Sequence, residues 1–172
     1  TFYEQPTNGL TYNSVSKDLN LESQEELNSL MILSALLGKV GAGERDHVQL
    51  QKEISRLSGG ISVSNHFYYD SNEELKGKTT LSSKFLPENT AETTKLIFEI
   101  LGKTDFTHHE RIKELMFQNF MGFQQSIVEN GHRFAMLGAS ASHNKLSHVQ
   151  ESLGGLSAIS KFAPFVTQQD DL

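Results

Sequence analysis

Hydrophobic residues recur every three or four positions between residues 23 and 57, and this spacing predicts two amphipathic helices. The first apolar stripe contains Leu27, Leu30, Met31, Leu33, Leu36 and Leu37, and the second contains Val48, Leu50, Ile54 and Leu57. Ser23 followed by Glu26, and Asp46 followed by Gln49, predict a reciprocal capping box at each helix start. Three glycines, Gly38, Gly41 and Gly43, are expected to end the first helix and form a turn.

Strict alternation of apolar and polar residues at positions 61–70 predicts a strand that begins after Gly59-Gly60. Positions 79–86 place Leu81, Ser83 and Phe85 on one face and are expected to pair with it as a hairpin, across a polar loop at 71–77. A shorter strand is expected around residues 10–15, followed by a polar link at 18–22.

The second half of the chain predicts further helices. Pro87 ends the last strand, and Asn89 with Glu92 and Thr107 with Glu110 repeat the helix start signal. The stripes that follow are Leu96, Ile97, Ile100 and Leu101, ended by Gly102, and then Ile112, Leu115, Met116, Phe120, Phe123 and Ile127, ended by Gly131. Residues 134–141 fit a helix or a packed turn, and residues 146–156 fit a last helix weakened by Gly154-Gly155.

These elements predict an α+β fold in which helices pack on one face of an antiparallel sheet. The 172 residues fit a single domain or a domain fragment over 1–172, with frayed ends at 1–8 and 164–172. Three strands are few for so many helices, so a sheet edge is expected to stay open, where a second copy could pair as a homodimer.

Composition excludes several classes of function. The net charge of −6 is spread along the chain, which argues against a nucleic-acid surface, and the absence of Cys excludes disulfides and thiolate metal sites. No apolar run approaches the roughly 20 residues that span a bilayer, and no signal peptide is visible, so no membrane partner is expected. The chain begins with Thr1, so we expect a piece of a longer protein, located in the cytoplasm or an organellar matrix.

Three segments carry a resemblance to a known family. They read TNGLTYNSVSKDL, LMILSALLGKVGAGERDHVQLQKEISRLSGGISVS and SIVENGHRFAMLGASASHNKLSHVQESLGGLS, in this order, and with the chain between them they cover nearly the whole sequence. Together they resemble the middle region of the presequence protease and falcilysin group of pitrilysin-class zinc peptidases. The resemblance implies the start of the second, inactive half of such an enzyme.

The resemblance also offers a test for catalysis. Active halves of this class carry His-x-x-Glu-His on the first helix of the domain, which binds zinc and activates water. The matching positions fall near Ile32, Ala35 and Leu36, whose side chains bind no metal, and the motif occurs nowhere in the chain. We therefore expect no catalytic, cofactor-binding or metal-binding residue in this segment, and zinc only in the catalytic half of a parent protein.

The remaining candidates for chemistry have simpler explanations. His108-His109-Glu110 offers a metal site, but adjacent helical residues point about 100° apart, so a helix start explains it better. His143 and His148 are poorly spaced for joint ligation, and capping or packing is the simpler reading of His132 beside Arg133. The other weak candidates are the Glu110/Glu114 pair, a phosphate loop at Gly38-x-x-Gly41-x-Gly43, and the serines Ser62, Ser64, Ser82 and Ser83, interpreted as a solvent-facing strand edge.

Three functions remain open. The first is a non-catalytic domain of a zinc metalloendopeptidase, which forms part of a chamber wall opposite the catalytic half and lies against unstructured peptide substrate. The second is a stand-alone binding or assembly module of the same fold that has lost zinc. The third is an independent enzyme that uses the histidines above.

Overall fold

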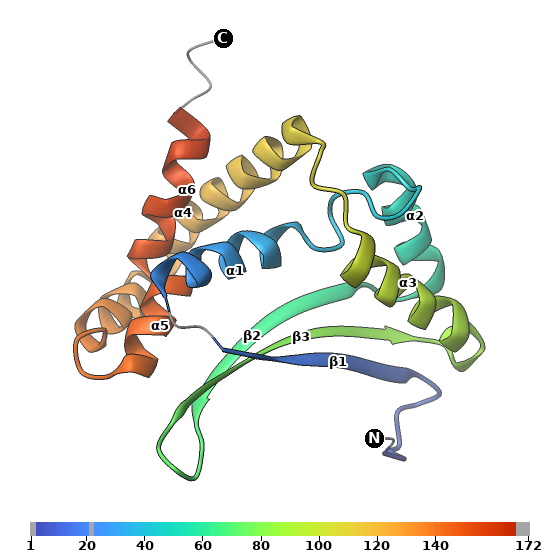
Figure 1. The fold of residues 1–172 in the computed structure, drawn as a ribbon, viewed down its shortest axis with the longest axis horizontal. Helices are drawn as coiled ribbons and strands as arrows, with labels where there is room; N and C mark the ends of the chain where they lie inside the picture. Colours follow the sequence, from blue (N-terminus) through green and yellow to red (C-terminus); the bar gives the residue numbers. More distant parts are fainter. Residues whose placement is uncertain (1–2, 21–22, 168–172) are drawn as a thin grey trace.

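The computed structural model describes residues 3–20 and 23–167 and confirms the α+β fold (Figure 1). Within that range the elements are β1 Thr11–Leu19, α1 Gln24–Leu36, α2 His47–Leu57, β2 Ile61–Tyr69, β3 Leu75–Phe85, the 3₁₀ turn Pro87–Asn89, α3 Thr90–Lys103, α4 His109–Ser140, α5 Lys145–Gly154 and α6 Leu156–Thr167. Figure 1 shows the described helices on one side of the sheet, while its other side is open.

The sheet has the order β1-β3-β2, and both outer strands pair antiparallel with the central β3. Two predicted connections are wrong, because Leu19 pairs with Gly77 and Tyr69 pairs with Leu75. The ladder therefore extends into the expected polar link at 18–22 and the expected loop at 71–77. The turn shrinks to residues 70–74, where the Asp70 carboxylate accepts the backbone N–H groups of residues 72 and 74.

One hydrophobic core lies between the sheet and the α2/α3 pair. Its buried members are Ala42, Leu50, Ile54, Leu57, Leu81, Leu96, Ile97 and Ile100, with Val15 and Val63 packed against them. The capping box at Asp46 and Gln49 forms as predicted and starts α2. Val48 and Leu101 were expected in the apolar stripes but are 47% and 42% exposed, because they lie at the margins of the buried helix faces.

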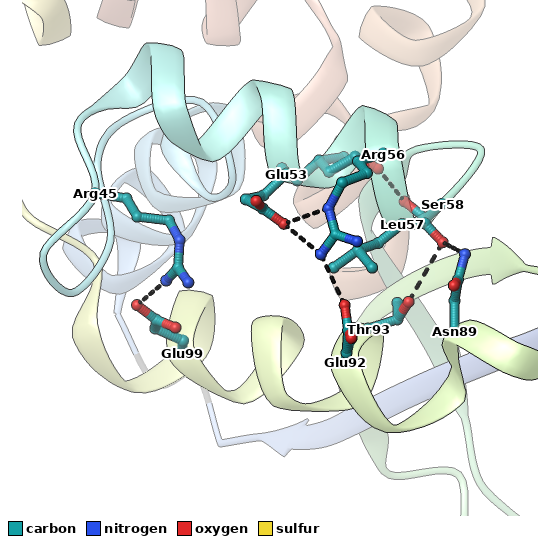
Figure 2. A network of polar contacts seen from close by, with 10 residues as sticks. Arg45, Glu53, Arg56, Leu57, Ser58, Asn89, Glu92, Thr93 and Glu99 are labelled. Atoms are coloured by element: carbon teal, nitrogen blue, oxygen red, sulfur yellow. Dashed lines mark hydrogen bonds and ion pairs between the residues drawn. The ribbon is translucent and has the colours of Figure 1, made fainter.

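Figure 2 shows polar contacts that fix α2 against α3. Arg56 forms ion pairs with Glu53 of its own helix at 3.0 Å and with Glu92 of α3 at 2.7 Å. The last carbonyl of α2, at Leu57, accepts hydrogen bonds from Asn89 and Thr93. Asn89 was expected to cap α3, but its side chain makes no capping bond because it serves this carbonyl instead.

A second core lies between α1, α4 and α6, away from the sheet. Leu36, Val40, Met116 and Phe162 are buried in it, and the rings of Phe123 and Phe162 lie 5.6 Å apart. The Ser23–Glu26 capping box forms as predicted, since the Ser23 hydroxyl accepts the Glu26 N–H and the Glu26 carboxylate accepts the Ser23 N–H. This packing orients α1 so that its apolar stripe faces other helices.

The long helix α4 does not end at Gly131 as predicted. It changes direction at Asn130, whose φ of −129° and ψ of 36° are not helical, and then continues to Ser140. Burial of Phe134 to 2% exposure explains the continuation, because this residue packs only if the helix resumes. Thr107 also does not cap α4; its hydroxyl donates instead to the Asp105 carboxylate.

The chain separates α5 from α6 at Gly155. The buried carboxylate of Glu151 accepts the backbone N–H of Ser157 at 2.9 Å and so caps the start of α6. Pro164 and the residues to Thr167 continue α6, and the expected loose end at 168–172 lies outside the described residues.

Candidate functional site

The open face of the sheet carries a cluster of small hydroxyl side chains. Leu81, Ser83 and Phe85 of the central strand point into the core, so the alternate positions face outward. Registered across the three strands, they form two rows, which we call the hydroxyl patch: Ser14, Ser82 and Ser62 in one row, and Ser16, Thr80 and Ser64 in the other. Hydrogen bonds join Ser14 to Ser82 at 3.1 Å and Ser16 to Thr80 at 3.0 Å.

Longer polar side chains flank the hydroxyl patch at both ends. Tyr12 and Lys84 are opposite each other at one end, where a depression of about 440 Å³ reaches from Tyr12 to Ser62. At the other end the register places Asp18, Lys78, His66, Tyr68 and Lys76. No aliphatic side chain occupies these described outward positions, so the face offers hydrogen bonds rather than apolar pockets.

Both outer strands have an edge that no other strand covers within the described residues. β1 and β2 each pair only with β3, although α1 and α5 approach β2 through the bonds Asn65 to Ser34 and Leu146 to Tyr69. The edge of β1 is the more open of the two. An unpaired edge can bind an extended peptide through main-chain hydrogen bonds, with little dependence on sequence.

The three positions that match the zinc motif lie in the second core. Leu36 is 3% exposed, and Ile32 and Ala35 pack against the same cluster from α1. Their neighbours are the apolar side chains of α4 and α6, so these positions supply packing and no donor atom. Zinc therefore does not fit this site, and no catalytic step can be derived through it.

His108 and His109 do not share a site. His108 precedes α4, and its imidazole lies 3.3 Å from the Asp105 carboxylate, whose pKa is lowered chiefly by the hydroxyl and backbone N–H of Thr107. Glu110 faces Lys113 at 3.4 Å, and Glu114 pairs with Arg111 at 2.6 Å. Across residues 3–20 and 23–167, no three His, Cys, Asp or Glu side chains gather as metal ligands would.

The other two histidine candidates are exposed on separate elements: His132 follows the bend of α4, and His143 lies in the turn before α5. His148 is also exposed, on α5, and it lines a cavity described below. The expectation that these residues form no joint ligand set agrees with their separation.

The glycine turn is not shaped for phosphate. The N–H of Gly43 donates to the carbonyl of Lys103 at 2.8 Å, and the N–H of Ala42 donates to Arg45. Gly43 has a φ of +63°, and an added Cβ would meet the Glu99 carboxylate that pairs with Arg45 (Figure 2). The turn thus attaches the end of α1 to α3, which explains its glycines.

Serine chemistry finds one pair on the sheet. The Ser64 hydroxyl lies 3.1 Å from Nε2 of His66, two residues along β2. A nucleophile of this kind needs a third group to orient the imidazole, and the described residues place no carboxylate in hydrogen-bond contact with His66. Ser83 corrects the interpretation of the serines as solvent-facing, because it is 5% exposed and donates to the carbonyl of Gly60.

Sequence reasoning found Ser62, Ser64 and Ser82 but missed Ser14, Ser16 and Thr80. The signal was present, because small hydroxyls recur at every second position in β1, β2 and β3. Only the register, however, reveals that these positions are neighbours. Among the described helices, none is both long and apolar enough to cross a membrane.

Comparison with known proteins identifies the region. The family model for the region associated with peptidases of the C subfamily of the pitrilysin class matches residues 1–163. A mitochondrial presequence protease of Danio rerio is 27% identical over 99% of this chain and 17% of its own length. The corresponding protein of Emericella nidulans is 29% identical over 91% of the chain and 15% of its length, and Protein HypA of Clostridium perfringens is 25% identical over 87% and 16%. The chain therefore spans about a sixth of these relatives.

Proposed function

The chain belongs to this peptidase-associated family, as a presequence protease-like region of the pitrilysin class, and from this premise we propose that it is a non-catalytic wall of a peptide-degrading chamber. In this proposal a catalytic half elsewhere in the parent protein holds zinc and cleaves. This segment lies opposite and contacts the unfolded peptide. The partners are therefore the catalytic half and the peptide substrate.

The loss of zinc chemistry is supported by α1. Its three matching positions carry Ile32, Ala35 and Leu36, and all three pack into the second core. Restoring ligands there would replace core side chains with polar ones, so the present sequence commits this helix to stability rather than to metal binding.

The surface that faces peptide is, in this proposal, the hydroxyl patch with the edge of β1. The single observation that carries this assignment is that the helices cover one face of the sheet and leave the other free of aliphatic side chains (Figure 1). Short hydroxyl side chains hydrogen-bond to main-chain groups of any sequence, and they select against no particular side chain. Such a surface suits a wall that meets many unfolded peptides.

Site-specific photo-crosslinking tests this assignment in the 172-residue chain. A benzophenone amino acid replaces Ser82 in one variant and Val128, which is 85% exposed on α4, in a matched control. After illumination with an unstructured peptide, the Ser82 variant is expected to crosslink several times more than the control. Equal crosslinking at the two positions would overturn the assignment.

The alternative of a stand-alone binding or assembly module remains a prediction, as does a homodimer through the open edge of β1. Sedimentation velocity separates it from the chamber wall: a dimer that persists at micromolar concentration, and that Ser16→Pro in β1 abolishes, would favour the module. Two compartments remain proposed for the parent protein, the cytoplasm and an organellar matrix. The mitochondrial location in the names above belongs to the relatives.

A further inference from the structure

A cavity of about 740 Å³ opens at the end of the sheet that carries the β2–β3 turn, on the helix side and away from the hydroxyl patch. Its walls come from the ends of the three strands, the first turn of α1, and the segment from the end of α4 into α5. Figure 1 shows α5 and the start of α1 above this end of the sheet. The volume falls within the range of small-ligand sites, roughly 300–1,000 Å³.

The floor of this cavity is apolar. Leu19, Leu27, Phe67, Leu75 and Val149 line it. Gly77 of the central strand makes room for this floor, because an added Cβ would lie 2.7 Å from the Phe67 ring and 3.2 Å from Leu19. The floor thus has the shape and chemistry to hold an apolar side chain.

The rim is cationic on the α5 side. Lys145 and His148 are three residues apart and line the cavity from the first turn of α5. Within the described residues neither side chain has an ion pair or hydrogen-bond partner, and no acidic residue lies in the first turn. A cation at the positive end of a helix is unfavourable, so an anion bound between these two groups would relieve the repulsion.

The polar groups on the α1 side are already paired. Gln24 donates to Asn28 at 3.0 Å and accepts from Ser152 at 3.4 Å, and Ser23 is used in its capping box. Asn144 is likewise used, because its side chain accepts the N–H of Ser147 and caps α5. The free hydrogen-bonding capacity therefore gathers at Lys145 and His148, above an apolar floor.

We infer that this cavity binds the C-terminal residue of a peptide, with an apolar side chain on the Phe67 floor and the free α-carboxylate between Lys145 and His148. The inference rests on the proposed contact with peptides but concerns a different surface. An internal segment of a parent chain would bring no free α-carboxylate to these cations. A peptide end held here would leave the rest of the peptide outside the cavity.

The test is an NMR titration of the ¹⁵N-labelled 172-residue chain. The probes are acetyl-Ala-Ala-Leu with a free carboxylate, the same peptide as its amide, and decanoate. We expect saturable shifts at residues of the cavity with the acid, and at least tenfold weaker binding of the amide. Lys145→Gln with His148→Gln is expected to reduce binding of the acid to the level of the amide, whereas Lys95→Gln, a lysine on α3 outside the cavity, leaves it unchanged.

Other outcomes overturn the inference in distinct ways. Equal binding of acid and amide would exclude carboxylate recognition, and tighter binding of decanoate than of the acid would assign the cavity to free amphiphiles. Shifts confined to the strands of the hydroxyl patch would overturn this site while supporting the proposed function. Ser142→Trp, which fills the cavity from an exposed turn residue, should abolish the cavity shifts alone.

Discussion

Replacement of Leu36 by Ala tests whether the zinc-motif positions of α1 now serve the core. Leu36 is 3% exposed and packs among Met31, Val40, Leu115 and Phe162. Truncating a buried leucine removes its transfer free energy and leaves a cavity, which costs about 2–5 kcal/mol. Since whole domains have unfolding free energies of only about 5–15 kcal/mol, this loss is a large share of the total.

Leu33→Ala is the matched control, because it makes the same chemical change on the same helix. Leu33 is 39% exposed, so much of its side chain already contacts water. We expect it to cost less than half of the Leu36→Ala value. Urea unfolding followed by circular dichroism gives both free energies, and unchanged m-values would show that both variants unfold from equally compact states.

Losses that agree within about 0.5 kcal/mol would refute the assignment of Leu36 to the core, because surface substitutions usually fall in that range. A zinc-binding version extends the test: Ile32→His with Ala35→Glu and Leu36→His restores the motif. These polar side chains would enter a packed apolar cluster, so we expect lower stability and no rescue by zinc. A large rise in stability with micromolar zinc would contradict the packing described for α1.

Three further predictions concern local structure, and each uses unfolding free energies measured in urea. Ser23→Ala should cost about 1 kcal/mol, whereas Ser23→Asn should cost little, because Asn also caps a helix; equal losses would contradict the capping role. Gly43→Ala should destabilise the chain by displacing the Arg45–Glu99 pair, whereas Gly102→Ala, which meets no atom within 4 Å, should stabilise α3 by up to about 1 kcal/mol. The pKa of Asp46 is lowered below 3.8, chiefly by the N–H of Gln49, so the folded state binds fewer protons than the unfolded state. The stability from this carboxylate is therefore complete above about pH 4 and is lost as the pH falls through the lowered pKa; Asp46→Asn should flatten that pH dependence, and an unchanged acid slope would contradict it.

Local patterns predicted the helices well, because their signals lie within a few residues. The capping boxes at Ser23 and Asp46 and the alternation at residues 61–70 appear in the structure as expected. The errors arise where distant contacts override local preference. Asn89 and Thr107 carry start signals but bond elsewhere, and the bend at Asn130 does not end α4, because Phe134 is buried beyond it.

The candidate site could be predicted only in part for the same reason. The aliphatic residues at the zinc-motif positions are visible in the sequence. The hydroxyl patch depends on the pairing of Ser14 with Ser82 and of Ser16 with Thr80, across more than 60 residues of chain. The cavity beside Lys145 joins β1, α1 and α5 in the same way, and no local pattern announces it.

The central claim is that this segment contacts peptide without cutting it. The most direct measurement is mass spectrometry of an unstructured peptide after incubation with the 172-residue chain and added zinc. The account predicts that the peptide stays intact over hours at every zinc concentration. Cleavage that a chelator abolishes and zinc restores would contradict it.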